Sequence, residues 1–362
     1  MSIPLSAGAT LHPLAVPARA DAADAGEFRE LARVRNLVYR ELTGRDEQDL
    51  SPSELLPRLR SREEQKTLVW AVRLSDEMIG RAMVDLPLEE GSRVATATIE
   101  LRPHAWGRGI GRAILPHIED AARSHGRSVI QNSTEQPATD GVQLPSPTGY
   151  GSVPDDHVAR FLTRSGFSLE QVYRISLLEL DAPARARRVD LSAEAQAASS
   201  DYRIVTWTLP TPDAHVDGYA WLKSRMSTDA PSADLDTDEE AWDAARVRRM
   251  EQRQAEAGHT LQVTAALHIR TGELAAFTEL GTGTGGSTTT IQHDTLVLRE
   301  HRGHRLGLRV KCAALAAWND VAPSSTRVIT YNAEENRPML DINEAMGFTA
   351  CAYEGVWKKE LT

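Results

Sequence analysis

The sequence predicts an α/β protein in which one arrangement of sheet and helices occurs twice. Three observations support this fold class. The chain has 362 residues, and single hydrophobic cores usually stop growing near ~250 residues. A Gly-rich turn between a strand end and a helix start occurs twice. The same elements then follow each turn in the same order, and such self-similarity fixes an architecture before any motif is interpreted. Two tandem domains are therefore expected.

The two Gly-rich turns are the clearest part of the repeat. The stretch Glu100–Leu115 (ELRPHAWGRGIGRAIL) has the pattern of a strand end, a turn and the start of a helix. The stretch Val297–Ala313 (VLREHRGHRLGLRVKCA) has the same pattern. The aligned glycines are Gly107 with Gly303 and Gly111 with Gly307.

Each turn is followed by a helix, an apolar strand, a second helix and a Gly-Phe pair. The strands begin near Ser128 and Arg327, and the pairs are at Gly166 and Gly347. The first copy is about 15 residues longer over this stretch. The extra residues fall in 133–156, whose Pro, Gly, Ser and Thr content predicts a surface loop.

The upstream halves correspond more loosely. Each copy has helices followed by two β segments around a polar turn. The helices are expected near Phe28–Leu42 and Ala214–Met226, and the β segments at Thr67–Val72, Met78–Val84, Leu261–Ile269 and Leu274–Thr278. The polar stretch between the copies, rich in small residues, predicts a linker. The predicted organisation is a first domain at 1–181, a linker at 182–201 and a second domain at 202–362.

Composition and charge narrow the class of protein. Hydrophobic residues make up 41% and charged residues 25%, an ordinary globular composition. The start of the chain lacks a basic signal-peptide region, and no apolar run approaches the ~20 residues of a membrane span. The two cysteines, Cys312 and Cys351, are not at ligand spacing, so neither disulfides nor a metal site is expected. A net charge of −10 disfavours nucleic acid and anionic lipid. A cytoplasmic protein without a membrane or nucleic-acid partner is predicted.

The Gly-rich turns have the chemistry of a phosphate site. A turn that opens a helix exposes backbone N–H groups at the positive end of the helix dipole. Gly109, Gly111 and Gly307 have no Cβ to obstruct a pyrophosphate. Such turns also occur without a ligand, and a Rossmann dinucleotide site is a further alternative. That alternative expects the motif after the first strand of a βαβ unit, whereas an antiparallel-type β region precedes it here.

On these residues the chain resembles the GNAT superfamily of N-acetyltransferases, whose acyl-CoA signature is Arg/Gln-x-x-Gly-x-Gly/Ala. The stretch Asp294–Gly307 resembles a tandem-domain subgroup of actinobacterial type, with an architecture like that of mycothiol synthase. The resemblance implies two tandem GNAT-type α/β (α+β) domains, each a mixed, mostly antiparallel sheet flanked by helices. It also implies acetyl-CoA as co-substrate.

Both copies depart from the signature. The first has Trp106 in place of Arg or Gln, and the second has Arg302 but carries Arg305 instead of the first glycine. The resemblance implies that the preceding strand ends contact the pantetheine and thioester carbonyl, where one backbone N–H would stabilise an oxyanion by about 3 kcal/mol. The implied acyl-CoA-binding residues are Leu101, Gly107, Arg108, Gly109, Ile110, Gly111 and Arg112 in the first copy and Leu296, Val297, Leu298, Arg302, Gly303, His304, Arg305, Leu306, Gly307, Leu308, Asn332 and Asn336 in the second.

The proton-transfer residues are less clear. Family enzymes often use a Tyr four residues before the final Gly-Phe as general acid, and here that position is Leu162 in the first copy and Asn343 in the second. A hydroxyl is thus absent from both. Asn343 could hold a water or hydrogen-bond the sulfur, and Tyr331 at a strand end is a substitute acid.

An alkyl ammonium has a pKa near ~10 and must lose a proton before it attacks a thioester. Strand alternation places His293 on the same face as Thr295 and Val297, with Asp294 on the other face. A β-bulge would reverse this assignment. His293 is the first candidate base, with Asp294 and Glu279 as alternatives. The first copy has Ala97 and Thr98 at the corresponding positions, which predicts a weaker catalyst.

The predicted function is acetyl-CoA-dependent N-acetylation of a small-molecule amine, with the chemistry in the second domain. Asp229, Asp234 and Asp236 would suit a cationic amine, although the last of them also resembles a helix cap. Alternatives are a catalytically silent acyl-CoA-binding or regulatory protein, and aminoacyl transfer on a duplicated GNAT fold. The oligomeric state is not predicted.

Overall fold

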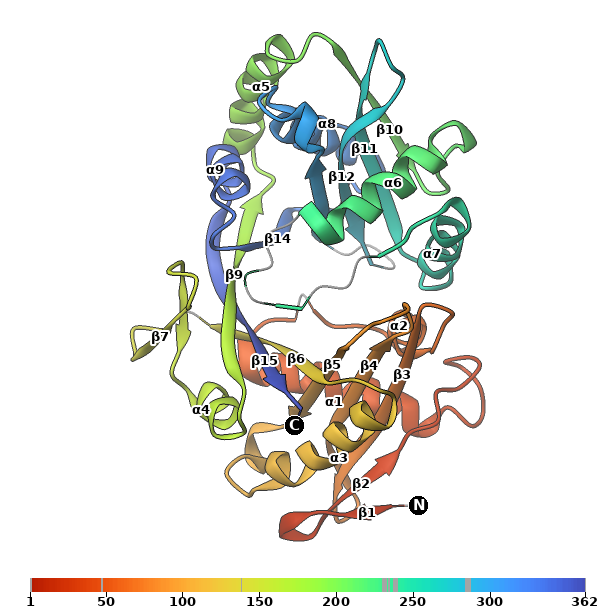
Figure 1. Cartoon of the computed structure of the whole chain (residues 1–362), viewed down its shortest axis with the longest axis vertical. Coiled ribbons are helices and arrows are strands. Elements are labelled where there is room, and N and C mark those ends of the chain that lie inside the picture. The colour runs from red at the N-terminus through yellow and green to blue at the C-terminus, as the bar shows by residue number, and fades with distance from the viewer. Residues whose placement is uncertain are drawn as a thin grey trace. The chain divides into compact units, whose positions relative to one another are not determined.

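The computed structural model describes residues 2–361 apart from 47, 138, 230–232, 234, 237–239 and 284–287. Within these residues the chain forms two compact units. Unit 1 comprises Met1–Val172, Ala233–Asp238 and Tyr353–Thr362, and unit 2 comprises Tyr173–Ser232 and Glu239–Ala352. Each unit is a sheet covered by helices (Figure 1).

The sheet of unit 1 has the strand order β1-β2-β3-β4-β5-β6-β15-β9. The pairs from β1 to β5 are antiparallel, and β5 and β6 are parallel. The strands are β1 Ile3–Pro4, β2 Ala9–Pro13, β3 Gln65–Leu74, β4 Glu77–Pro87, β5 Val94–Leu101, β6 Val129–Pro137 and parts of β9 Ser168–Glu179 and β15 Thr349–Glu360. The helices are α1 Gly26–Thr43, α2 Pro52–Leu59, α3 Ile110–Ser124 and α4 His157–Arg164, with short 3-10 turns η1 Ser6–Gly8 and η2 Pro103–Ala105.

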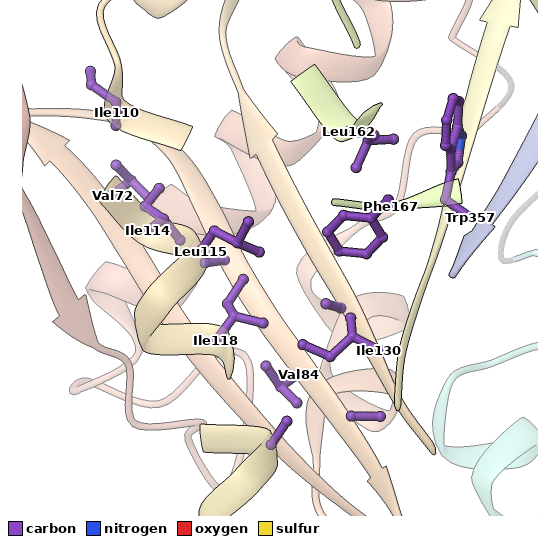
Figure 2. Close-up of a cluster of buried hydrophobic side chains, with 14 of the residues drawn as sticks. Val72, Val84, Ile110, Ile114, Leu115, Ile118, Ile130, Leu162, Phe167 and Trp357 are labelled. Atoms are coloured by element: carbon purple, nitrogen blue, oxygen red, sulfur yellow. The ribbon is translucent and has the colours of Figure 1, made fainter. Parts of the chain in front are cut away.

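Both faces of this sheet are packed. Helices α1 and α2 bury Phe28, Val38 and Leu55 against one face. Figure 2 shows the other core, in which the apolar stripe of α3 meets β4, β6 and the end of α4. Its members include Val84, Ile110, Ile114, Leu115, Ile118, Ile130, Leu162, Phe167 and Trp357. The residues predicted as an extra surface loop contain the hairpin β7 Gln143–Pro145 and β8 Ser152–Pro154.

Unit 2 repeats this plan. Its sheet has the strand order β15-β9-β14-β13-β12-β11-β10, in which β13 and β14 are parallel and the pairs from β13 to β10 are antiparallel. The strands are β10 Tyr202–Thr208, β11 Thr260–His268, β12 Leu274–Thr282, β13 Thr289–Val297 and β14 Arg327–Ala333. The helices are α5 Ala182–Ala197, α6 Asp213–Asp229, α7 Ala244–Glu256, α8 Leu306–Val321 and α9 Arg337–Met346, with the 3-10 turn η3 Arg299–His301.

The segment predicted as a linker forms helix α5. Asp181 caps it by accepting a hydrogen bond from the N–H of Ala184 at 2.9 Å, and its many alanines favour the helix. Helix α5 lies beside α8 (Figure 1), and Ala184 and Ala195 belong to the same apolar cluster as Leu308 and Leu315 of α8. Small residues therefore indicate close helix packing here, and not a flexible tether.

Strands β9 and β15 differ from a simple division of the chain into halves. Residues 168–172 of β9 belong to unit 1, whereas 173–179 pair with β14 in unit 2. The end of the chain, Tyr353–Thr362, belongs to unit 1. The domain boundaries at 181 and 202 stay a prediction. They differ from this division, in which the second part of β9 belongs to unit 2 and the end of β15 belongs to unit 1.

Candidate functional site

In each unit the parallel strand pair separates just before the Gly-rich turn. In unit 2, β13 and β14 pair from Thr289 with Arg327 to Gln292 with Thr330, and the described pairing ends there. In unit 1 the last described pair of β5 and β6 is Thr96 with Gln131. The separated ends of β5 and β13 then lead through a 3-10 turn into α3 and α8. The predicted strand–turn–helix repeat is confirmed.

The turns have the backbone conformation of an anion site. Gly107 and Gly109 have φ values of 70° and 77°, and Gly303 and Arg305 have 87° and 54°. Gly109 and Arg305 are the N-caps of α3 and α8, and neither makes a side-chain cap hydrogen bond. The first N–H groups of both helices therefore lack a capping side chain, which fits the binding of a phosphate group.

Trp106 and Arg302 make the same contact in the two copies. The indole Nε1 of Trp106 donates to the carbonyl of Leu101 at 2.8 Å, and Nε of Arg302 donates to the carbonyl of Val297 at 3.2 Å. Each side chain fixes the end of the strand that precedes its turn. Trp106, a departure from the signature in sequence, therefore preserves one structural task of the arginine.

The helix glycines serve packing more directly than phosphate approach. A Cβ on Gly307 would lie 3.1 Å from Cδ1 of Ile342 in α9 and 3.7 Å from Cγ2 of Val297. A Cβ on Gly111 would lie 3.5 Å from the ring of Phe161 in α4. Large residues at these positions would disturb helix packing, so their effect on activity would not isolate a ligand site.

Arg305 occupies a left-handed conformation in which L side chains are strained. Its ion pair with Glu194, at 2.6 Å, joins two exposed side chains and stabilises little. We expect Arg305→Gly to raise the free energy of unfolding by about 0.5–1 kcal/mol, because glycine adopts this conformation without strain. Urea unfolding would measure this change. The matched change Gly109→Arg in α3 should lower stability, and a loss of stability in Arg305→Gly would contradict the strain argument.

A β-bulge lies at the predicted site on β13. The register with β12 shifts between Thr278 and Leu280, so that Glu279 alone lies opposite both His293 and Asp294. A bulge of one residue reverses the alternation of side chains beyond it. The alternation predicted from the sequence, with His293 and Asp294 on opposite faces, is therefore wrong.

Both bulge side chains lie on the face covered by α6. Nζ of Lys223 on α6 contacts Oδ2 of Asp294 at 2.5 Å. The His293 ring lies over Gly281, since a Cβ there would be 2.7 Å from Nε2 of His293 and 3.1 Å from Leu261, a member of the core under α6 and α7. The bulge thus gathers the two predicted bases on one face.

Glu279 joins the same polar cluster. Its carboxylate accepts a hydrogen bond from the hydroxyl of Tyr219 and contacts Nζ of Lys223 at 3.3 Å. Burial raises the pKa of Glu279, whereas Lys223 counteracts the burial of Asp294 and lowers its pKa. Tyr219, Lys223, Glu279 and Asp294 form what we call the α6 cluster. Sequence reasoning missed Tyr219 and Lys223, although both fall on the apolar stripe of α6 with Val216 and Ala220.

The three candidate bases therefore differ in availability. Glu279 is buried, with its side chain 4% exposed, and is already bonded to Tyr219 and Lys223. Asp294 is paired with Lys223, which weakens it as a base. His293 lies exposed beside Asp294 on the same face. The geometry favours His293.

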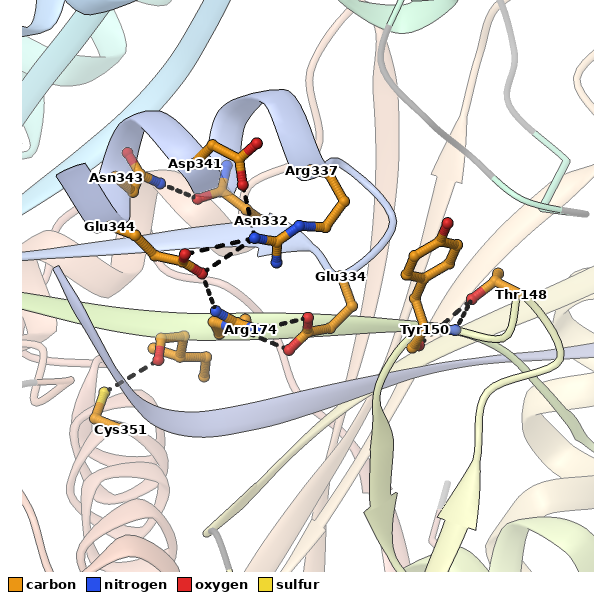
Figure 3. Close-up of polar contacts among 11 residues, drawn as sticks. Thr148, Tyr150, Arg174, Asn332, Glu334, Arg337, Asp341, Asn343, Glu344 and Cys351 are labelled. Atoms are coloured by element: carbon orange, nitrogen blue, oxygen red, sulfur yellow. Dashed lines mark hydrogen bonds and ion pairs between the residues drawn. The ribbon is translucent and has the colours of Figure 1, made fainter.

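Asn343 lies on α9 at the position of the usual tyrosine, and it is buried. Its Nδ2 donates to Oδ1 of Asn332 at 2.7 Å (Figure 3), and its Oδ1 accepts from Nζ of Lys311 at 2.9 Å. Tyr331 precedes Asn332 on the part of β14 beyond its last described pair with β13. Asn336 is the N-cap of α9 without a side-chain cap bond. Lys311, which sequence reasoning missed, completes a polar chain with Asn343 and Asn332.

The remaining predicted acyl-CoA residues divide into two groups. The apolar ones are buried or half-buried beside the strand end and first helical turn, and they are Leu101, Ile110, Leu296, Val297, Leu298, Leu306 and Leu308. The exposed ones line the turns and α3, and they are Gly107, Arg108, Gly109, Arg112, Arg302, Gly303, His304 and Arg305. The side chains that could contact a phosphate directly belong to the second group, whereas Ile110, Leu306 and Leu308 offer only the backbone N–H groups of the first helical turns.

Unit 1 has different polar chemistry. At the positions of His293 and Asp294 it has Ala97 and Thr98, and Nδ2 of Asn132 donates to the carbonyl of Ala97 at 2.7 Å. That bond joins β6 to β5 one position beyond their last described pair. A buried ion pair of Arg81 with Glu100, at 2.6 and 2.9 Å, lies nearby on β4 and β5. No residue of this group matches the bases of unit 2.

The acids expected to attract a cationic amine are already paired. Asp229 at the end of α6 is buried and contacts Arg225 at 2.5 Å, Arg299 at 3.5 Å and Arg302 at 3.8 Å. Asp236 contacts Lys358 at 3.3 Å within unit 1. Asp234 lies outside the described residues. Asp229 and Asp236 therefore give no support to the recognition of a cation.

One group of potential metal ligands occurs among the described residues. Ligand atoms of Glu273, Glu300 and His301 lie within 4.8 Å of one another. His301 already accepts or donates a hydrogen bond with the Tyr202 hydroxyl at 2.9 Å, and its other nitrogen lies 3.5 Å from Glu273. Two exposed carboxylates on a turn do not make a metal centre.

Comparisons with known proteins agree with this geometry. Residues 31–142 match the model of the acetyltransferase (GNAT) family. The whole structure is similar to a tandem GNAT protein from the clavulanic acid biosynthesis pathway, with 26% identity, a TM-score of 0.75 and coverage of 97% of this chain and 98% of the other. Residues 31–142 thus match the GNAT acetyltransferase family, and the whole chain has the fold of a tandem GNAT protein. No curated protein matches the sequence.

More distant structures share the tandem GNAT fold. A GCN5-related N-acetyltransferase from Sphaerobacter thermophilus aligns with a TM-score of 0.60 at 14% identity, over 98% of this chain and 96% of the other. A putative acetyltransferase from Pyrococcus horikoshii aligns with a TM-score of 0.53 at 11% identity, over 98% and 90%. The predicted tandem α/β GNAT fold and the predicted enzyme class are thereby confirmed.

GNAT enzymes typically use acyl-CoA and acetylate amines. The residues matched by the family model lie in unit 1, whereas the candidate bases lie in unit 2. Among the described residues, none of the helices has the length and apolar character needed to cross a membrane.

Proposed function

We propose that this chain transfers the acetyl group of acetyl-CoA to an amine of a small molecule, with the chemistry in unit 2. The observation that carries this proposal is the β-bulge that puts His293 and Asp294 on one face beside the separated end of β13. Unit 1 has the same backbone plan but only Ala97 and Thr98 there. The tandem GNAT protein of 26% identity comes from a small-molecule pathway, which supports a small-molecule acceptor.

Acetyl-CoA supplies a thioester whose carbonyl carbon the amine attacks. The exposed turn before α8 binds the phosphates through its backbone N–H groups, and Arg302 fixes the carbonyl of Val297 at the strand end. His293 takes the proton that the ammonium must lose, and the neighbouring Asp294 carboxylate stabilises the imidazolium. Lys223 holds Asp294 in place through its 2.5 Å contact.

Unit 1 serves as a structural partner or binds CoA without turnover. Its turn has both glycines in the left-handed conformation, which supports CoA binding. Leu162 and Leu115 are buried where unit 2 has Asn343 and Lys311, so the polar groups for proton transfer are missing.

Mass spectrometry of acetyl-CoA incubated with a panel of amines would test the activity. The unit responsible can be tested with a matched pair, Arg302→Met and Trp106→Phe, because each variant keeps bulk and removes the donor to the strand-end carbonyl. We expect Arg302→Met to lower kcat/KM for acetyl-CoA about fivefold, the value of one hydrogen bond, and Trp106→Phe to stay within about twofold. The reverse result would place the chemistry in unit 1, and no acetylated product from any amine would contradict the proposed function.

A further inference from the structure

A lysine lies at the centre of the apolar core of unit 2 without an acidic partner among the described residues. Lys311 on α8 is 1% exposed. Nζ of Lys311 donates a hydrogen bond to Oδ1 of Asn343 at 2.9 Å and lies 5.8 Å from the centre of the Phe348 ring. Burial lowers its pKa to about 7. A buried cation is expensive unless it is paired, so its presence requires an explanation.

The titratable surroundings of Lys311 do not explain it. The neighbouring Cys312 is a thiol whose pKa burial raises to about 11, and Arg188 of α5 lies near that thiol. Asn343 on α9 and Asn332 on β14 do not titrate. Within the part of the chain that the structure describes, Lys311 is therefore held by the amide of Asn343 and the ring of Phe348, and not by a carboxylate.

The fold itself does not need these polar groups. At the matching positions unit 1 has Leu115 for Lys311 and Leu162 for Asn343, both buried in its core. That core packs around the same strand–turn–helix plan (Figure 2). The polar chain is thus specific to unit 2, where the candidate bases also lie.

The hydrogen bonds of this chain run in one direction. The ammonium of Lys311 donates to the carbonyl oxygen of Asn343. The amide nitrogen of Asn343 in turn donates to the carbonyl oxygen of Asn332, as Figure 3 shows. Charge at the first donor polarises each following amide, and such chains strengthen cooperatively. The last amide nitrogen, on Asn332, has no described hydrogen-bond acceptor, and it lies on the part of β14 beyond its described pairing with β13.

We propose that Lys311 is a positioning residue that acts through Asn343 and Asn332 to stabilise the CoA thiolate as it leaves. The inference rests on the proposed function of unit 2. As the nitrogen–carbon bond forms, the carbon–sulfur bond breaks and its electron pair passes to sulfur. His293 takes the proton that the ammonium loses before the attack and passes it to solvent, and it then takes the second proton of the nitrogen as the carbon–sulfur bond breaks. The thiolate takes a proton from solvent after release. The polarised amide of Asn332 supplies the donor that the missing tyrosine hydroxyl would have supplied.

The test compares Lys311→Met with wild type over pH 6 to 8.5. Methionine fills a similar volume, and replacing a buried charge by an apolar residue is often neutral or stabilising, so the variant should fold. We expect kcat to fall roughly 10-fold with little change in KM for acetyl-CoA. The deficit should be largest at pH 6 and shrink by pH 8.5, because wild-type Lys311 loses its charge as pH rises through about 7.

Two matched variants separate this role from packing. Leu115→Met, at the equivalent position of unit 1, should leave kcat unchanged. Asn343→Leu, which copies Leu162, should reproduce the loss seen in Lys311→Met. A deficit in Lys311→Met that does not vary with pH, or a kcat within about twofold of wild type at every pH, would overturn the inference.

Binding of CoA and desulfo-CoA gives a readout that does not require turnover. Isothermal titration at pH 7.5 should show wild type binding CoA at least about threefold more tightly than desulfo-CoA, because a stabilised thiol ionises below its usual pKa near ~8.5. Lys311→Met should bind both alike. An unchanged ratio in the variant overturns the inference alone, whereas a wild-type chain that binds CoA in neither unit overturns the proposed function as well.

Discussion

Replacing His293 by alanine is expected to lower the rate of acetyl transfer about 10²- to 10⁴-fold, the usual contribution of a general base. His293 is exposed, so the variant should keep its melting temperature and its affinity for acetyl-CoA. Among the three candidate bases, His293 is also the exposed one, whereas Glu279 is buried and Asp294 is half-buried. Steady-state kinetics with the amine found by mass spectrometry would measure the change.

Chemical rescue and a second variant make this result specific. The ring of His293 lies over Gly281, so its removal leaves space beside a residue without a side chain, and added imidazole should restore part of the rate. Asp294→Asn should lower the rate less than His293→Ala, because the carboxylate acts on the imidazole and not on the amine. If His293→Ala keeps near-normal turnover while Asp294→Asn loses it, Asp294 is the base.

The repeat could be predicted from sequence because it depends on backbone conformation. Gly107 and Gly109 adopt left-handed φ values that few other residues tolerate, so the turn leaves a signature. The departure at Arg305 was visible in sequence, but its strained conformation was not. In sequence, Trp106 looks like the loss of the signature arginine. Comparing residue types does not show that an indole and a guanidinium can donate to equivalent carbonyls in the two copies.

The face of the candidate bases could not be predicted, because it depends on one extra residue in β13. The stretch from Thr289 to Val297 alternates in sequence as a regular strand would, and nothing in it indicates which residue is left unpaired. The bulge follows from the pairing with β12, where Glu279 opposes two residues. Pairing partners far apart in sequence determine such irregularities.

Lys223 and Lys311 could have been found from the sequence, because each lies on the apolar face of a helix. On α8 the positions 308, 311, 312, 315 and 318 share one face, and Lys311 is the charged member of an otherwise apolar stripe. On α6, Lys223 lies four residues after Tyr219 on the buried face in the same way. A charged residue at a core position of a predicted helix indicates a buried polar partner, which in both cases proved to be part of the candidate site.

The exchange of segments of β9 and β15 between the two units could not be predicted by comparing the two copies in sequence. Strands β9 and β15 end the two copies after matching Gly-Phe pairs, so each is expected beside its own preceding strands. In the structure β9 pairs with β14, and the last residues of β15 belong to unit 1. Two strands with similar sequences can exchange places in a duplicated fold, because either strand can form the same backbone hydrogen bonds with the neighbouring strand.

Replacing Lys223 by methionine is expected to lower the free energy of unfolding of unit 2 by about 3 kcal/mol, the low end for breaking a buried ion pair. The variant leaves Glu279, 4% exposed, without its cation, and Asp294 loses its 2.5 Å partner. The low end applies because the Asp294 side chain is 37% exposed and water can solvate it in part. Urea unfolding followed by circular dichroism would measure the loss.

The sign of the pH dependence distinguishes this cause from lost packing. Lys223 lowers the pKa of Glu279, which burial already raises, so its removal raises that pKa further above the unfolded value. A group whose pKa is raised in the folded state stabilises the protein below its unfolded pKa, and this contribution is lost as pH rises through the folded pKa. The deficit of Lys223→Met should therefore be larger at pH 8 than at pH 5. Adding Glu279→Gln to the variant removes the uncompensated charge and should recover most of the stability at pH 8, whereas a deficit that is equal at both pH values and survives the second change would mean that Lys223 acts through packing against Phe277 and Trp242 instead.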